Sequence, residues 1–470
     1  MKTLKRITGI LLIAAMLITA LAGVSFAATS DYTVEGGMLK AYSGSGGDLV
    51  IPGNLGITRI EMYAFSNCQT LTSVTIPADV VFVDPRAFVW SRKLTSISVA
   101  DGNTKYTGVG GVLLSKDKKT LVTYPCGKTG DYSVPSTVTE ILTMAFTGCE
   151  GLTSVTIPEG VAKIGGNAFS GCSGLISAVI PASVTSIGSQ AFGTCKALTK
   201  ITVAGGSANY SDSDGVLFSK DGTVLIRYPG GKTGSYKVPS SVKTIENSSF
   251  EGCEQLLGVT IPMGITKIED YAFSNDYAMT KIVISSSVTQ IGENVLDGCP
   301  NTTVFCSAGS AAETYAKANS ISFLPLNVTA VSTASSVLVN GSSVAFEAYN
   351  IAGNNYFKLR DLAKVISGTD RQFSIDIDSA NRLIYLKTGK SYSAVGGELT
   401  PPSTKGSVTA SFSTWTVFLN GTEISLTAYN INGNNYFKLR DVGETIDFGV
   451  TYSAKTNTIN VETTTGYVLE

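Results

Sequence analysis

The sequence contains no histidine. Histidine is the commonest general base in enzymes and the commonest protein ligand of transition metals. Its absence excludes catalysis by Ser-His-Asp or Cys-His sets and zinc sites built with His ligands. Charged residues are also scarce, at 15%, and the 35 basic side chains are balanced by 36 acidic ones. No basic surface that could neutralise phosphates is implied, so nucleic acid is not expected as a partner.

The chain is rich in glycine, with 49 residues, and its 470 residues are too many for one hydrophobic core. This composition predicts many turns and short strands, arranged in several domains or in a repeat array. Basic residues at positions 2, 5 and 6 precede an apolar run over residues 7–24 and a small-x-small triplet that ends at Ala27. This pattern predicts a signal peptide cleaved after Ala27, because the run is short for an uncleaved membrane helix.

Cleavage would leave 32 basic and 36 acidic residues, a net charge of about −4. No cysteine at the cleavage point could carry lipid, and no later apolar run is long enough to span a bilayer. The mature protein is therefore expected to be secreted, or held at the cell surface without a covalent link.

A short unit recurs between positions 50 and 300, and it reads L-x-x-V-x-I-P, then V-x-x-I-G, then A-F-x-x-C. The last position of the unit falls at Cys68, Ser91, Cys149, Cys172, Cys195, Cys253, Asp276 and Cys299. Most of these positions follow one another at a 23-residue period. The gaps from Ser91 to Cys149 and from Cys195 to Cys253 are longer, which marks two similar insertions at about positions 100–130 and 204–234.

One unit cannot fold alone. In residues 152–157 the alternation turns Val155 and Ile157 inward, while Ser154 and Thr156 face out. Burying about six large side chains contributes roughly 9–18 kcal/mol. Ordering the backbone of a unit this long costs on the order of 1–2 kcal/mol per residue, which is more. Neighbouring units must supply the missing burial, so the repeat predicts a stacked solenoid with a parallel sheet along one face.

The combination of these two motifs at a 23-residue period resembles the BspA-type leucine-rich repeats of bacterial surface proteins. The resemblance covers about residues 37–323, where residues 44–52 are similar to the usual first strand and residues 309–316 to the usual closing helix. It implies a mostly β repeat solenoid that serves adhesion or ligand binding at the cell exterior, and no catalysis.

The tail contains a second repeat, in which residues 336–399 correspond to residues 416–470. The run Asn-Asn-Tyr-Phe-Lys-Leu-Arg-Asp occurs at both 354–361 and 434–441. We predict two strands around an Asn-Gly or Gly-Asn turn, a helix from about Leu359 or Leu439, and in the first copy two strands at 373–377 and 383–387.

The tail copies are similar to the copper amine oxidase N-terminal domain, also called the stalk domain. The resemblance implies a spacer or a wall-attachment role, and neither copy carries a histidine for copper, so no cofactor or metal is expected. The predicted organisation is a signal peptide at 1–27, the solenoid at 28–325, small α+β domains at 326–399 and 413–470, and a linker at 400–412.

The cysteines form a ladder on successive coils, comprising Cys68, Cys149, Cys172, Cys195, Cys253 and Cys299. Because ladder side chains of parallel strands point the same way, we favour buried free thiols over disulfides. The alternative of a disulfide stays open, and Cys299 with Cys306 is its best pair. Cys126 has Gly230 as its counterpart in the second insertion, which indicates an incidental residue.

The outward strand positions form the candidate binding face. They carry mainly hydroxyl side chains, which are also simply good soluble β-formers, so that simpler explanation stays open. No aromatic platform lies among them, which favours contact with protein over stacking on sugars. The positions are Ser73, Thr75, Ser96, Ser98, Ser154, Thr156, Lys200, Thr202 and Lys281.

Three other motifs are weaker. The Lys-Thr-Gly triplets at 128–130 and 232–234 match a motif of penicillin-binding enzymes, and Ser240 with Lys243 matches their S-x-x-K motif. Those enzymes need that serine at a helix start and an S-D-N element, whereas the triplets here are predicted in turns between strands. Residues 212–215 hint at a calcium loop but lack a distal Glu, which favours a hairpin turn. Asp376 and Asp378 have no acidic counterparts in the second copy and are read as a solvated strand end.

The sequence therefore predicts a non-catalytic extracellular binding or adhesion protein, whose partner is a protein or a surface polymer. The first alternative is a structural cell-envelope protein that associates with itself. The remote alternative is a wall-active hydrolase that uses acidic pairs.

Overall fold

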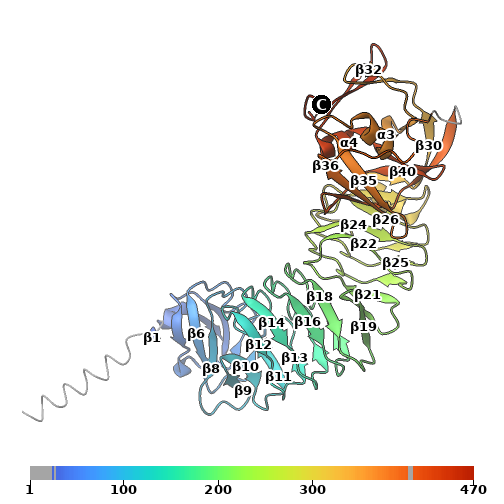
Figure 1. Ribbon diagram of the computed structural model, residues 1–470. Helices are drawn as coiled ribbons and strands as arrows, with labels where there is room; N and C mark the ends of the chain where they lie inside the picture. The colour runs from blue at the N-terminus through green and yellow to red at the C-terminus, as the bar shows by residue number, and fades with distance from the viewer. Residues whose placement is uncertain (1–23, 26–27, 401–405, 470) are drawn as a thin grey trace, which may run out of the picture.

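A computed structural model describes residues 24–25, 28–400 and 406–469. Figure 1 shows a long curved stack of coils that ends in a rounded tail, so the predicted mostly β solenoid with a small α+β part is confirmed. The predicted signal segment lies outside the described residues except for β1 (Val24–Ser25), which pairs with β4 (Gly47–Val50). No helix among the described residues is long and apolar enough to cross a membrane.

Each coil contributes one strand to each of two opposite sheets. In one coil these are β14 (Leu152–Thr156) and β15 (Lys163–Ile164), and in the next they are β16 (Ser177–Ile180) and β17 (Ser186–Ile187). Both pairs are parallel and in register at the 23-residue offset. As predicted, Val155 and Ile157 are buried, whereas Ser154 and Thr156 lie on the outer face.

An aromatic column and a thiol column run through the stack. The rings of Phe146, Phe169 and Phe192 stack with centroids 4.7 and 5.2 Å apart. The thiols of Cys172 and Cys195 donate to the carbonyl oxygens of Phe146 and Phe169, both at 3.1 Å. All eight cysteines are free, and all but the half-buried Cys68 are buried, as the sequence favours.

Ser91 replaces a ladder cysteine without loss of the hydrogen bond. Its hydroxyl donates to the carbonyl oxygen of Phe65 at 2.5 Å and accepts from the amide of Cys68 at 3.1 Å. Asp276 differs, because its carboxylate accepts from the amide of Cys253 at 2.7 Å and has no hydrogen to donate when ionised.

Three hairpins divide the solenoid into three segments. They are β2–β3 (Tyr32–Glu35 and Met38–Tyr42), β9–β10 (Tyr106–Val109 and Val112–Ser115) and β19–β20 (Tyr210–Ser213 and Val216–Ser219). In the second hairpin the turn residues Gly110 and Gly111 both have positive φ, 58° and 81°, which suits a tight two-residue turn between twisted strands.

The hairpins interrupt the outer strand face, which is a correction to the single continuous sheet that the repeat predicts. Gly111 and Gly215 accept hydrogen bonds from the amides of Ile97 and Ile201, both at 2.8 Å, and so occupy the edge that the next coil would need. Three sheets result: β1, β4, β6 (Leu71–Ile76) and β8 (Ser96–Val99); β12 (Gly130–Ser133), β14, β16 and β18 (Lys200–Val203); and β22 (Gly234–Lys237), β24 (Leu256–Ile261), β26 (Lys281–Ile284), β28 (Thr303–Cys306) and β29 (Phe323–Pro325).

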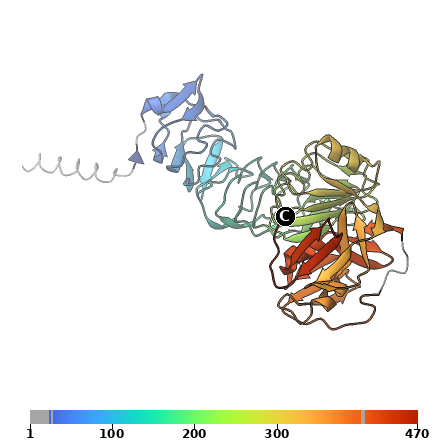
Figure 2. The same cartoon turned by 90° about the horizontal axis from the view of Figure 1, so that it is seen from above.

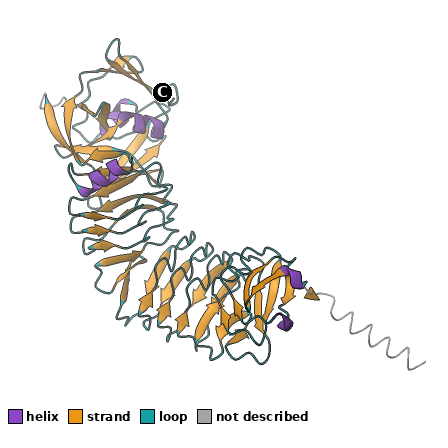
Figure 3. Cartoon of the chain, turned by 180° about the vertical axis from the view of Figure 1, so that it is seen from behind, coloured by secondary structure: helices purple, strands orange, loops and turns teal. Residues whose placement is uncertain are grey.

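The opposite face is built from short strands, and helices are few (Figure 3). Helix α2 (Ala311–Ala318) begins at Ser310, whose hydroxyl caps it, and closes the last coil where the sequence predicts a helix. The short strands are β5 (Arg59–Ile60), β7 (Phe82–Val83), β11 (Thr120–Thr123), β13 (Glu140–Ile141), β15, β17, β21 (Val224–Arg227), β23 (Thr244–Ile245), β25 (Lys267–Ile268) and β27 (Gln290–Ile291), and the 3-10 turns are η1 (Thr29–Asp31) and η2 (Gly53–Leu55).

The two tail copies form one closed barrel of six strands, three from each copy. Equivalent residues face each other across it, since Thr329 pairs with Thr409 and Phe357 with Phe437. A two-fold axis therefore relates the copies. The first copy supplies β30 (Asn327–Ser332), β33 (Ala348–Ile351) and β34 (Asn354–Lys358), and the second supplies β37 (Ser407–Phe412), β40 (Ala428–Ile431) and β41 (Asn434–Lys438).

The two outer sheets of the tail also take strands from both copies. One contains β32 (Ser342–Ser343), β31 (Ser336–Val339), β43 (Thr458–Glu462) and β42 (Gly449–Ser453). The other contains β35 (Phe373–Asp378), β36 (Leu383–Thr388), β38 (Thr416–Leu419) and β39 (Thr422–Ile424).

Helices α3 (Leu359–Val365) and α4 (Leu439–Ile446) start where the sequence predicts them. Their buried faces join a single hydrophobic core to which both copies contribute. The sequence predicts two small domains in succession, but the strand pairing unites the copies into one, because each copy completes a sheet of the other.

Candidate binding surfaces

The residues of the candidate binding face lie on outward strand positions, but on three separate sheets. The first sheet holds Ser73 and Thr75 on β6 and Ser96 and Ser98 on β8; the second holds Ser154 and Thr156 on β14 and Lys200 and Thr202 on β18; the third holds Lys281 on β26. The hairpins separate these groups, so the structure does not bring all nine into one strip.

On the first sheet the hydroxyl groups are largely satisfied by one another and by one acid. Ser73 donates to Asp48 at 2.7 Å, and Thr75 and Ser98 share a hydrogen bond of 2.8 Å. The hydrogen bonds from Ser73 and Thr72 lower the pKa of Asp48. This sheet therefore offers a ligand fewer hydroxyl groups without a hydrogen-bond partner than its composition suggests.

The second sheet exposes apolar side chains that the sequence analysis did not predict. Val179 is 51% exposed and lies beside Thr202 in the register of β16 and β18, while Ile176 is 56% exposed just before β16. Alignment of the repeat units places Val179 at the outward position of Thr156. The 23-residue period could therefore have predicted that Val179 is exposed. Hydroxyl, apolar and lysine side chains thus alternate on one surface.

The third sheet is covered by the tail. The rings of Phe305 and Phe412 stack with centroids 3.9 Å apart, and Thr280 donates to Ser425 at 2.8 Å. The carboxylate of Glu423 accepts from the amide of Ser235 at 3.1 Å. Figures 1 and 2 show the tail strands against the last coils of the solenoid.

Lys281 lies at the edge of this contact and lines a small pocket there with residues of the tail. Burial lowers its pKa, and the charge of Glu423 opposes that shift. Lys281 therefore does not belong to an open binding face, which corrects its place among the candidate residues.

The Lys-Thr-Gly triplets have a structural explanation. Lys128 donates to the carbonyl oxygen of Gly110 at 3.2 Å, and Lys232 donates to that of Asp214 at 2.7 Å, so each lysine braces the turn of a hairpin. Asp212 accepts from the amide of Val203 at 2.7 Å, which fixes the second hairpin to β18. Within the described part of the chain, no cluster of three or more acidic or thiol side chains is arranged to hold a metal ion.

At the end of the first tail copy, Asp376 is paired with Lys387 at 3.5 Å, and Asp378 accepts from the amide of Asn381 at 3.1 Å. Asp376 is exposed, and Asp378 caps the turn between β35 and β36. This arrangement agrees with the reading of a strand end.

Comparison with known proteins gives one family and several solved structures. Six copies of the BspA type leucine rich repeat region match residues 42–109, 122–214 and 230–347, which together are more than half of the chain. The last match runs past the solenoid into the first tail strands. None of the curated proteins matches the chain.

Among solved structures, the chain is similar to a leucine-rich repeat protein from Eubacterium ventriosum, with 25% identity, a TM-score of 0.38, and coverage of 59% of this chain and 69% of that one. The pneumococcal vaccine antigen PcpA has 21% identity and a TM-score of 0.39, with 60% and 82% covered. A leucine rich cell surface protein from Faecalibacterium prausnitzii has 23% identity and a TM-score of 0.31, with 63% and 98% covered.

Proposed function

Since the chain belongs to the BspA-type leucine-rich-repeat family, we propose that it is a non-catalytic binding protein of the cell exterior. The solenoid contacts the partner, a protein or a surface polymer. The tail serves as a spacer or as the attachment to the cell wall, in line with its resemblance to the stalk domain. Export is by the signal peptide cleaved after Ala27.

The open outer face of the second sheet carries this proposal. It presents Val179 and Ile176 among the hydroxyl groups of Thr156 and Thr202 and the ammonium group of Lys200. A surface that mixes exposed apolar groups with hydrogen-bonding groups at regular spacing is typical of protein contacts. The strands beneath are fixed by the stacked core, so little ordering is required when a partner binds.

The test applies the whole mature chain, residues 28–470, to immobilised extracellular matrix proteins and to cell-wall fractions, with binding followed by surface plasmon resonance. Thr156→Glu and Val179→Glu place carboxylates on the second sheet and should abolish solenoid-dependent binding, because an unpaired charge would be desolvated at the contact. Ser186→Glu, an exposed change on the opposite face, is the matched control and should bind normally.

Binding that persists in both strand-face variants would move the contact away from the second sheet. Sedimentation of the mature chain tests the alternative role separately. We expect a monodisperse monomer. Concentration-dependent assembly of the mature chain that Val179→Glu removes would instead favour the self-associating structural role.

A further inference from the structure

The tail contains two pockets that the two-fold axis makes equivalent. The first pocket, of about 340 Å³, lies between the turn at 353–355 of the first copy and the start of α4 at 438–440. The second pocket, of about 250 Å³, lies between the turn at 433–435 of the second copy and the start of α3 at 358–360. Each pocket thus combines a turn from one copy with the helix start of the other.

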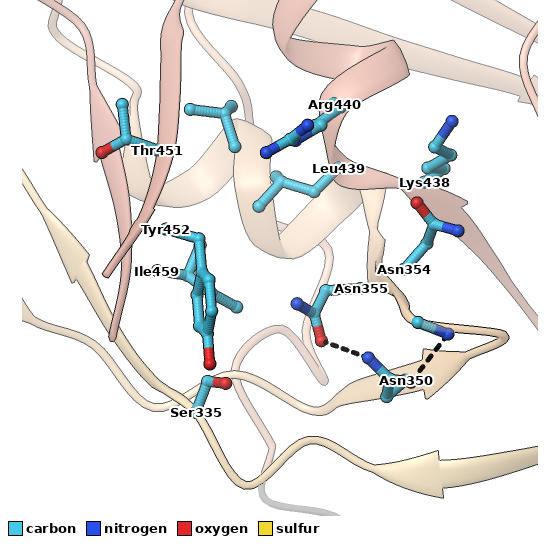
Figure 4. A pocket seen from close by; sticks show the side chains of 12 residues that line it. Ser335, Asn350, Asn354, Asn355, Lys438, Leu439, Arg440, Thr451, Tyr452 and Ile459 are labelled. Atoms are coloured by element: carbon cyan, nitrogen blue, oxygen red, sulfur yellow. Dashed lines mark hydrogen bonds between the residues drawn. The ribbon is translucent and has the colours of Figure 1, made fainter. Parts of the chain in front are cut away.

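Hydrogen bonds fix the direction of one amide in the first pocket. The backbone amide of Gly353 donates to Oδ1 of Asn350 at 3.2 Å, which leaves Nδ2 of Asn350 to donate to Oδ1 of Asn355 at 3.4 Å. Thr333 donates to the same Oδ1 of Asn355 at 3.1 Å. With its oxygen held twice, Asn355 must turn its NH₂ group toward the pocket, as Figure 4 shows.

The second pocket repeats this arrangement. Gly433 donates to Oδ1 of Asn430 at 3.2 Å, and Nδ2 of Asn430 donates to Oδ1 of Asn435 at 3.2 Å. Ser413 takes the place of Thr333 and donates to Asn435 at 3.0 Å. Each pocket therefore holds an oriented amide donor whose position is set before any ligand binds.

Each pocket is also lined by one arginine. Arg440 lines the first pocket and Arg360 the second, where its guanidinium donates to Oδ1 of Asn434 at 3.4 Å. Each pocket also has a lysine in an ion pair: Lys438 pairs with Asp441 at 3.1 Å, and Lys358 pairs with Glu347. Among the residues that the structure describes, no acidic side chain lines either pocket.

Aromatic side chains also line each pocket. Tyr452, which is 49% exposed, stands across the first pocket from Asn355 in Figure 4, and Trp415 lines the second. An aromatic face beside oriented donors can take a sugar ring, whose C–H groups pack on the ring while its oxygen atoms accept hydrogen bonds. A guanidinium in a pocket without acidic lining favours a carboxylate or a phosphate.

We propose that the two pockets are binding sites for the anionic saccharide units of a repeating polymer, each taking one unit that bears a carboxylate or a phosphate. This inference rests on the proposed attachment role of the tail, and it is independent of what the solenoid binds. Because both sites lie on one rigid barrel, a polymer that reaches both is held far more tightly than a single unit.

The test is calorimetric titration of the mature chain with three probes: trigalacturonate, maltotriose phosphate and uncharged maltotriose. At least one anionic probe should bind at two sites per chain, and maltotriose should bind at neither. The trigalacturonate and maltotriose phosphate results distinguish a carboxylate from a phosphate. Failure of both anionic probes to bind overturns the proposal.

Asn355→Asp is the sharpest variant, because it keeps the shape and the bonds to Asn350 and Thr333 but replaces the donor with a carboxylate. It should remove one of the two sites, and Asn355→Asp with Asn435→Asp should remove both. Arg440→Ala should weaken the first site about 10- to 100-fold, as expected for the loss of one hydrogen bond between charged groups. Asn301→Ala, an exposed asparagine of the solenoid, is the control.

Polymeric probes test whether the two sites act together. Polygalacturonate immobilised on a sensor should lose much more than half of its affinity for the single Asn355→Asp variant. Equal binding of the Asp variants and the unchanged chain overturns the proposal. The matrix-binding measurement of the solenoid with Val179→Glu is unaffected by these changes, so failure of one proposal is distinguishable from failure of the other.

Discussion

The hydroxyl of Tyr106 accepts a hydrogen bond from the backbone amide of Val83 at 3.0 Å, across the junction between the first two segments of the solenoid. Tyr210 does the same for Ile187 at 2.9 Å at the next junction. Val83 and Ile187 belong to β7 and β17, the last strands of their sheets, whose outer edges lack a further strand. The second and third hairpins therefore each contribute a tyrosine hydroxyl that accepts a hydrogen bond from the edge strand of the preceding segment.

Replacement of Tyr106 or Tyr210 by Phe should lower the free energy of unfolding by about 1–2 kcal/mol each, because a backbone amide loses its partner. The sites are far apart, so the double variant should show the sum. Urea unfolding measures the loss, and hydrogen exchange should speed up at β7 or β17. Tyr63→Phe, on an exposed ring, is the control. A loss no larger than that of the control would contradict the edge-capping role.

Asp276→Asn should stabilise the protein, and more so as the pH rises. Burial raises the pKa of Asp276 well above its usual value, while the amide of Cys253 and the charge of Arg227 oppose this and Glu251 adds to it. When the pKa of a carboxyl is higher in the folded than in the unfolded state, the protein is most stable below about pH 4, where the group is protonated in both states. The free energy of unfolding then falls as the pH rises toward the folded pKa. Asparagine keeps the acceptor for Cys253 and carries no charge.

The measurement is urea unfolding at pH 5 and pH 7.5. The advantage of Asp276→Asn should grow by about 1.4 kcal/mol per pH unit within that interval, up to the folded pKa. Asp276→Cys restores the ladder and should donate to the carbonyl oxygen of Phe250, as the other ladder thiols do for their aromatic neighbours. Asp79→Asn, at an exposed site, should show the same difference at both pH values. An advantage of Asp276→Asn independent of pH would refute the buried-charge explanation.

Phe412→Ala should loosen the tail from the solenoid. The ring stacks on Phe305, and its removal deletes an apolar contact of this junction at a cost of roughly 1–3 kcal/mol. Small-angle scattering should report a larger radius of gyration and a broader distribution of distances. Phe418→Ala removes a half-buried ring that stacks on Tyr385 within the tail, and it should leave the scattering curve unchanged.

Thiol titration should find about eight reactive groups after denaturation without reductant, because all eight cysteines are free in the structure. In the native protein only Cys68, which is half-buried, should react quickly. Far fewer than eight groups after denaturation would mean that disulfides form. In the native Cys68→Ser variant, the fast reaction should be absent and the buried thiols should still react slowly.

The solenoid could be predicted because the 23-residue period of the sequence sets the length of each coil. A 23-residue spacing of Val155 and Ala178, or of Phe146 and Phe169, sets both the coil and the column in which each side chain stacks. The closing helix and the tail strands at 373–378 and 383–388 were also within reach, since their caps and alternation are local. The first hairpin, residues 32–42, was missed although its Gly36-Gly37 turn resembles Gly110-Gly111 in the first insertion.

The breaks in the strand face and the covering of Lys281 could not be read from the period. They depend on hydrogen bonds made by Gly111 and Gly215 to neighbouring edges and on a tail contact through Phe305. Such contacts join segments that are distant in sequence, and no local pattern of residues specifies them. The two equivalent tail pockets were hidden for the same reason, because their walls come from different copies.

The interleaving of the tail copies has an evolutionary consequence. A gene fragment that encodes only residues 326–399 would leave β31 and β36 without the strands β43 and β38 that lie beside them. Such a half would have to recruit a second molecule and form an obligate dimer. Loss of either copy would therefore make folding of the tail depend on association between two chains.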